Sequence, residues 1–98
     1  LIQNIDKKIS LDEISDSRGI PFNELISELE SIVFSGTKID IDYYLEEILD
    51  DDQQEELKEY FLESQSEHIK DAMIEFNGDY DEEELRLYRI KFINDASN

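Results

Sequence analysis

The sequence is short of the residues that would build a disulfide, a thiolate metal site or a phosphate-binding loop. It has no cysteine, and its three glycines, Gly19, Gly36 and Gly78, are far apart. Without cysteine there can be no disulfide and no thiolate ligand, and isolated glycines do not form a loop that cradles phosphate. The longest unbroken apolar stretch, Ile32-Val33-Phe34, is far shorter than the ~18 residues of a membrane span. We therefore expect no membrane segment, and no signal peptide is visible.

Basic residues are also scarce. Nine Lys and Arg residues stand against 27 Asp and Glu residues, a formal net charge of −18. Residues 1–40 hold four basic and eight acidic groups (net −4), residues 42–84 hold two and 18 (net −16), and residues 85–98 hold three and one (net +2). Such a charge disfavours DNA phosphates and anionic lipid and favours a basic partner.

The length of 98 residues allows a single domain, 1–98, and leaves no room for the nucleotide fold of an ATPase or a dehydrogenase. Five Tyr and five Phe residues provide for a packed core that a disordered acidic tail would lack. Because the chain begins at Leu1 rather than Met, we expect it to be a fragment of a longer protein. A cytoplasmic setting is the default expectation.

Apolar residues recur three and four positions apart through most of the chain, which predicts an all-α fold of five to six short helices and at most one short strand. In the first half, residues 1–40, Ile2, Ile5 and Ile9 indicate the end of a helix or a docked arm. The remainder has helix-turn-helix proportions. Its expected parts are a helix over 10–17 behind a Ser10–Glu13 capping box, a turn at Arg18-Gly19, a helix over 21–34 ended by Gly36, and a short strand within 37–41.

The second half, residues 41–98, is predicted to be an acidic helical half whose helices begin at carboxylates or serine. The expected starts are Asp42, Asp50–Asp52 with Glu55 after it, a Ser64–Glu67 capping box, and Asp81 with Glu84. Asn77-Gly78 is expected to end the helix that precedes Asp81. The last helix carries apolar residues on two sides, which predicts that it is wedged between other helices.

No group of residues has the spacing of a metal site or a catalytic site. His68 is the single histidine and is interpreted as a solvated residue in the first turn of a helix. A calcium loop begun at Asn77 would place Glu82 where glycine is required and Tyr88 where the closing Glu is required. We therefore predict a domain that is not an enzyme and binds no cofactor of its own.

The stretch Leu11-Asp-Glu-Ile-Ser-Asp-Ser-Arg-Gly-Ile-Pro-Phe-Asn-Glu-Leu-Ile, with the later Ser35-Gly-Thr-Lys-Ile-Asp-Ile-Asp-Tyr-Tyr-Leu, resembles the helix-turn-helix domain at the C-terminus of RecQ-type ATP-dependent DNA helicases, the Bacteroides-like branch in particular. The Gly78-Asp and Glu-Leu-Arg-Leu stretches are similar to the same tail, so that the resemblance extends over essentially the whole chain. It implies a bacterial parent that unwinds DNA in repair and recombination. The parent would use ATP and Mg, and Zn bound by cysteines upstream; no residue of this chain corresponds to those sites.

The resemblance raises the question of whether this domain itself binds DNA. A DNA-reading helix-turn-helix surrounds its second helix with Lys and Arg, but the non-core positions of helix 22–34 are Asn23, Glu24, Ser27, Glu28, Glu30 and Ser31. A basic edge that flanks the motif, formed by Lys7, Lys8, Arg18 and Lys38, is the candidate nucleic-acid contact. We predict weak duplex binding or none, and a helix-turn-helix that serves mainly as a packing unit.

The acidic half offers a candidate face for docking onto a basic protein surface, either the rest of the helicase or a repair protein. Its residues are Tyr43, Tyr44, Glu55, Glu56, Glu59 and Glu63. The adjacent tyrosines point about 100° apart on a helix, so one is expected in the core and the other half-buried, or one serves as an aromatic anchor for the partner. A stand-alone acidic adaptor, or a mimic of DNA charge, is the remaining alternative.

Overall fold

Seven α-helices and no strand make up the part of the chain that the computed structural model describes, residues 2–64 and 68–96. They are α1 (Ile2–Asp6), α2 (Leu11–Arg18), α3 (Phe22–Phe34), α4 (Asp42–Ile48), α5 (Asp51–Glu63), α6 (Ile69–Phe76) and α7 (Glu82–Ala96). The all-α class is confirmed. The expected number of five to six helices is too low, because the segment that begins at Ile2 is a short helix that buries Ile5.

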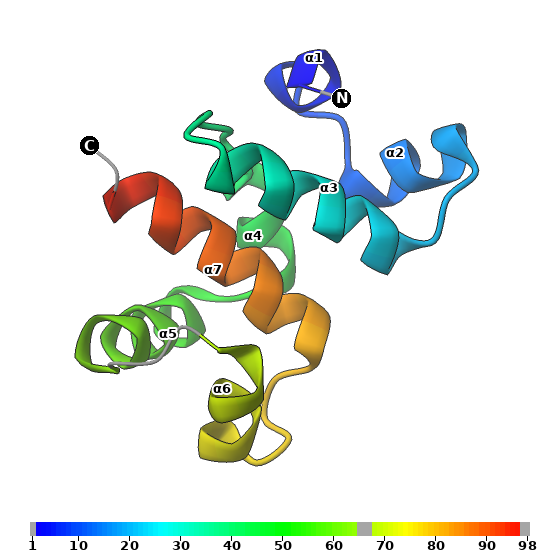
Figure 1. Ribbon diagram of the computed structural model, residues 1–98. Coiled ribbons are helices and arrows are strands. Elements are labelled where there is room, and N and C mark those ends of the chain that lie inside the picture. The colour runs from blue at the N-terminus through cyan, green and yellow to red at the C-terminus, as the bar shows by residue number, and fades with distance from the viewer. Residues whose placement is uncertain (1, 65–67, 97–98) are drawn as a thin grey trace.

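Helix α7 lies at the centre of the domain, with α3 beside it and with α5 and α6 on the opposite side (Figure 1). It packs against α3, α4, α5 and α6. Leu85, Leu87, Tyr88 and Ile90 are all buried, although they point in different directions around the helix. The prediction of a wedged last helix is confirmed, and one buried apolar cluster joins residues of both halves.

The turn between α2 and α3 forms where the sequence places it. Gly19 has φ +67°, and the backbone N–H groups of Gly19 and Ile20 bind the carbonyls of Asp16 and Ser15, which is a Schellman-type ending. Pro21 precedes the first residue of α3. The Ser10–Glu13 capping box is wrong, because the Ser10 side chain makes no capping hydrogen bond; nothing in the structure explains why it does not.

The segment 37–41 alternates as expected, with Ile39 and Ile41 buried, but it is not a strand. Its partner is a side chain rather than another strand. Asn94 of α7 accepts a hydrogen bond from the Ile39 N–H at 3.4 Å and donates one to the Ile39 carbonyl. Because one amide side chain satisfies this backbone, no ladder forms.

Two of the expected helix starts in the acidic half lie at the expected residues but have different capping contacts. Asp42 lies in the first turn of α4 behind Ile41, and its carboxylate binds Lys91 instead of capping the helix. Helix α5 begins within the expected Asp50–Asp52, and its reciprocal capping box joins Asp50 to Gln53 rather than Asp52 to Glu55.

The other two starts have different outcomes. Asp81 and Glu84 form the predicted capping box of α7, with contacts of 2.7 and 2.9 Å. The Ser64–Glu67 box lies partly outside the described residues, because Glu67 is not among them; Ser64 follows the end of α5, and exposed His68 precedes α6. Within the described ranges, no helix has the length and apolar character needed to cross a membrane.

Candidate interaction surfaces

The outer face of α3 differs from that of a DNA-reading helix. No Lys or Arg lies on α3, and Asn23, Glu24, Ser27 and Ser31 are exposed. Glu30, expected to point outward, is instead buried at 9 % exposure. The helix that should enter a DNA groove therefore carries no cation and turns one of its carboxylates toward α7.

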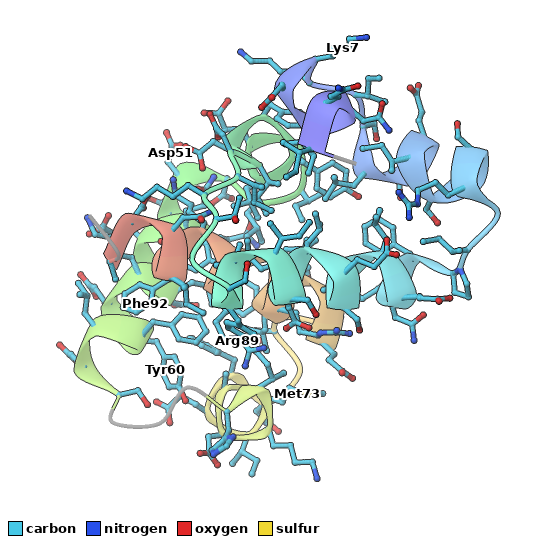
Figure 2. The ribbon with its side chains drawn as sticks, turned by 45° about the horizontal axis from the view of Figure 1, so that its top comes forward. Lys7, Asp51, Tyr60, Met73, Arg89 and Phe92 are labelled. Carbon is cyan, nitrogen blue, oxygen red and sulfur yellow. The ribbon has the colours of Figure 1, made fainter. Side chains whose placement is uncertain are left out.

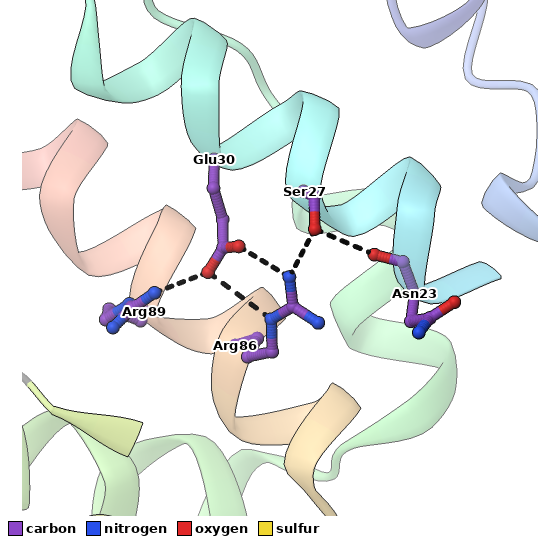
Figure 3. A network of polar contacts seen from close by, with 5 residues as sticks. All are labelled: Asn23, Ser27, Glu30, Arg86 and Arg89. Carbon is purple, nitrogen blue, oxygen red and sulfur yellow. Dashed lines mark hydrogen bonds and ion pairs between the residues drawn. The ribbon is translucent and has the colours of Figure 1, made fainter. Parts of the chain in front are cut away.

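Glu30 is held there by two arginines of α7 (Figure 3). Arg86 donates to one carboxylate oxygen at 2.6 Å and to the other at 3.4 Å, and Arg89 donates to the second oxygen. Arg86 also donates to the Ser27 hydroxyl at 2.9 Å. A guanidinium that binds both oxygens of a carboxylate fixes orientation as well as distance, so that this network locks α7 in register along α3.

The charges in this network respond to one another. Burial by itself would raise the pKa of the Glu30 carboxyl, but the hydrogen bonds and charges of Arg86 and then Arg89 outweigh it and lower the pKa below its ordinary value of 4.5. The same hydrogen bond to Glu30 raises the pKa of Arg86. Glu30 is therefore ionised at neutral pH, and its charge is neutralised inside the domain.

The four residues of the basic edge are all exposed, but they do not form one basic surface. Lys7 projects from the end of α1 (Figure 2), next to Lys8. Lys38 lines a hollow together with Asp6, whereas Lys7 and Lys8 are not among the residues that line it. Arg18 lies at the turn after α2 and binds Glu28 of α3 at 3.2 Å.

The hollow that contains Lys38 is acidic. It has a volume of about 400 Å³ and is lined by Asp6, Asp40, Asp42, Asp95, Lys38 and Lys91, together with Ile39 and Asn94. Lys91 binds Asp42 at 2.8 Å and approaches Asp95 at 3.8 Å. These carboxylates offset the lysines of the edge, which is unfavourable for a DNA phosphate.

The two adjacent tyrosines serve internal contacts. The Tyr43 hydroxyl donates to the Ile9 carbonyl at 2.6 Å, and the Tyr44 hydroxyl donates to the Asp12 carboxylate at 3.0 Å. Tyr44 is 5 % exposed and Tyr43 is half-buried. The expectation of one core and one half-buried tyrosine is confirmed, and Tyr44 is too buried in this conformation to be an exposed anchor.

The carboxylates of α5 remain at the surface. Glu55, Glu56, Glu59 and Glu63 are all exposed. Glu56 accepts a hydrogen bond from the buried Tyr80 hydroxyl at 2.8 Å, so that this carboxylate has a role inside the domain. Glu55, Glu59 and Glu63 recur every fourth residue and therefore form one row along the helix; no ion pair is formed by this row among the described residues.

Sequence reasoning missed the contacts that join the halves, namely those of Glu30 with Arg86 and Arg89, of Asp42 with Lys91, and of Ile39 with Asn94. Their partners are 49 to 59 residues apart in the chain. The available signal was the excess of positive charge in residues 85–98 on a helix expected to lie between others.

A comparison with known protein families matches the helix-turn-helix half of the chain. Residues 1–45 match the family model described as the RecQ-1-like helix-turn-helix domain. The matched segment is a RecQ-type helix-turn-helix domain. The match contains α1, α2, α3 and the first turn of α4. Residues 46–98 lie outside it, so the predicted resemblance over the rest of the chain is not part of the match. No curated protein matches the chain.

Proposed function

We propose that this chain is the non-catalytic C-terminal accessory domain of a RecQ-type DNA helicase that acts in repair and recombination. Its own task is to dock onto a basic protein surface, on the body of the helicase or on a repair partner. In this proposal ATP, Mg and Zn belong to the parent chain, DNA is bound through the parent, and the setting is the bacterial cytoplasm. The narrower assignment to the Bacteroides-like branch remains a prediction.

One observation carries the docking role: the helix-turn-helix offers DNA no cation on its second helix, whereas α5 presents a row of unpaired carboxylates. Two of the three carboxylates of α3 bind arginines of the domain, since Glu30 binds Arg86 and Arg89 and Glu28 binds Arg18. Glu55, Glu59 and Glu63 are exposed and repel one another. A basic surface would relieve this repulsion, and a helicase that grips DNA phosphates must have such a surface.

The test removes the three negative charges of the row on α5 and compares this variant with one that loses three negative charges elsewhere. In the full-length protein, Glu55→Gln, Glu59→Gln and Glu63→Gln are combined, and Glu56 is retained for Tyr80. The control combines Glu13→Gln, Asp16→Asn and Glu24→Gln, which are exposed positions of the helix-turn-helix half. DNA affinity, unwinding and capture of the domain by the rest of the helicase are measured at two salt concentrations.

We expect the α5 variant to change capture and DNA affinity more than the control does, with a difference that shrinks as salt rises, because such fields are screened over about 8–10 Å. If the α5 variant folds normally and behaves like the control in every assay, the acidic row is only a solvated surface and the docking proposal is wrong.

The second candidate is direct nucleic-acid binding by the edge formed by Lys7, Lys8, Arg18 and Lys38, all of which are exposed. We expect the isolated domain to bind duplex DNA no more tightly than about micromolar at physiological salt, the range of non-specific binding. Tighter binding that is lost with Arg18→Glu and Lys38→Glu would favour this candidate. A stand-alone acidic adaptor, the third candidate, ends if the upstream sequence carries Walker motifs.

A further inference from the structure

An apolar groove lies between α5 and the last turns of α7, beside the carboxylate row. It has a volume of about 320 Å³, and its apolar lining consists of Leu62, Tyr88, Phe92 and Ala96. Leu62 is 63 % exposed, although it is a large apolar residue. Phe92 is half-buried, and its ring is 5.6 Å from that of Phe61, so it lies on the side of α7 that faces α5 (Figure 2).

Charged residues border the groove: Lys58, Lys91 and Asp95 line it, and the carboxylate row of α5 lies beside it. On α5, Glu59 and Glu63 lie one turn before and one residue after Leu62, and the charge of Glu55 is near the ring of Tyr88. Asp95 closes the border on α7. The two lysines of the border do not reverse this charge, since Lys91 is bound to Asp42 and Lys58 lies between Glu55 and Glu59.

An apolar groove with carboxylates beside it favours some ligands over others. An anionic ligand or a second copy of this chain would bring further negative charge against the row, because the chain has a net charge of −18. A purely polar basic segment would leave Leu62 in water. A segment with lysine or arginine around one apolar side chain would pair its cations with the carboxylates and bury its apolar side chain against the apolar lining.

We propose that the groove between α5 and α7 binds a leucine-like side chain of a basic segment, whose cations pair with Glu55, Glu59 and Glu63. This inference rests on the proposed docking function and adds an apolar anchor to it. The anchor adds to the binding free energy a contribution that salt does not screen, because burial of apolar surface does not depend on charge.

The test uses two lysine–alanine helical peptides that differ in one central residue, leucine or serine. Their dissociation constants are measured for the 98-residue chain, for Leu62→Ser and for the control Ile74→Ser. Ile74 is 77 % exposed on α6 and is not among the residues that line the groove. Both substitutions replace exposed side chains and are expected to preserve the fold.

We expect the leucine peptide to bind the unmodified chain and Ile74→Ser about tenfold more tightly than the serine peptide, as partial burial of one leucine side chain predicts. In Leu62→Ser the preference should fall to about twofold or less. Amide chemical shifts at Leu62 and Phe92 should move with the leucine peptide. A preference that persists in Leu62→Ser, or equal binding of both peptides by the unmodified chain, overturns the groove proposal.

The same titrations separate this proposal from the docking proposal. In Glu55→Gln, Glu59→Gln, Glu63→Gln we expect both peptides to weaken by the same factor, with the leucine preference retained. If neither peptide weakens but the preference remains, the pairing of cations with the row is overturned, and charge docking with it, while the leucine site in the groove stands. If neither peptide binds the unmodified chain, both proposals are overturned. Sedimentation that shows a dimer abolished by Leu62→Ser would assign the groove to a second copy and overturn the proposal.

Discussion

Helices α3 and α5 have the same length, 13 residues each, and both pack on α7, but they use their side chains in opposite ways. Helix α3 buries four apolar residues and Glu30, whereas α5 buries only Leu57 and Phe61. The carboxylates Glu28 and Glu30 of α3 bind arginines, and the row on α5 is exposed.

This difference separates a helix whose side chains stabilise the fold from a helix whose side chains are available to a partner. Helix α3, which would read DNA in a DNA-binding helix-turn-helix, here packs along α7 and turns Glu30 toward it. Helix α5 buries only Leu57 and Phe61, and its carboxylate row faces solvent, so that its exposed residues can change without loss of the fold. Substitutions in the two helices should therefore give different patterns of stability and binding.

The largest contrast is expected from leucine truncation. Leu29 of α3 is fully buried and Leu62 of α5 is 63 % exposed. Leu29→Ala should lower the free energy of unfolding by about 2–5 kcal/mol, because it removes apolar contacts and leaves a cavity, while Leu62→Ala should change it by less than about 0.5 kcal/mol. Urea unfolding followed by circular dichroism measures both. Equal losses would mean that α5 is as deeply embedded as α3.

The second contrast compares two glutamates. Glu30→Gln removes the charge shared by Arg86 and Arg89 and should lower the free energy of unfolding by about 1–3 kcal/mol. Glu59→Gln removes an exposed charge that is repelled by its neighbours, and stability should stay the same or rise. Thermal unfolding of both variants tests this; a loss in Glu59→Gln as large as that in Glu30→Gln would contradict it.

The Glu30 contribution also has a predicted pH dependence. Its pKa is lowered in the folded state below 4.5, so the unfolded chain binds more protons at that carboxyl. The stabilisation is therefore fully present above about pH 4.5 and is lost as the pH falls through the folded pKa. The stability difference between the unmodified chain and Glu30→Gln should shrink in acid; a constant difference down to pH 2 would contradict the assignment.

A smaller effect is expected at high pH, where two buried tyrosines of the second half contribute, one bound to a carboxylate of each half. Burial and then a hydrogen bond to a carboxylate raise the pKa of Tyr44, bound to Asp12, and of Tyr80, bound to Glu56, above the ordinary 10.0. Their contributions are present below pH 10 and are lost as pH rises through the folded pKa values.

Tyr44→Phe and Tyr80→Phe should each cost about 1 kcal/mol at neutral pH and each reduce the fall of stability above pH 10. Unfolding free energies measured from pH 7 to 12 check this. An unchanged alkaline slope in both variants would show that these two hydroxyls do not control it.

The smallest contrast concerns two helix starts. The Asp50 carboxylate accepts from the Gln53 N–H, whereas the Ser10 side chain caps nothing. Asp50→Ala should therefore cost about 1 kcal/mol, and Ser10→Ala should cost only a few tenths of that. Chemical denaturation of both variants, with Gln53→Ala to break the same box from its other side, distinguishes a true cap from a sequence pattern.

Most of the helices could be predicted because their information is local. The spacing of Phe22, Leu25, Ile26 and Leu29 defines α3, and Asp81 and Glu84 begin α7 through contacts three residues apart. The prediction failed where a distant group replaced a local one. Asp42 binds Lys91 instead of its own helix start, and Asn94 takes the place of a strand beside Ile39.

The candidate surfaces divide in the same way. Exposure of Glu55, Glu59 and Glu63 followed from a helix with few apolar positions, and it was predicted correctly. The burial of Glu30 was not, because a carboxylate at a non-core position of α3 differs from its neighbours only in facing two arginines of a helix more than fifty residues away.

The sequence by itself therefore determined the all-helical class, the turn at Gly19 and the charge of each half, since periodicity, glycine conformation and composition are properties of short segments. The likeness of residues 1–45 to a RecQ-1-like helix-turn-helix domain is also contained in the sequence. Only the tertiary structure decided which charges are neutralised and which remain at the surface. The physical reason is that desolvation and pairing depend on what lies opposite a side chain: α7 lies opposite Glu30, and no described residue pairs with the row on α5.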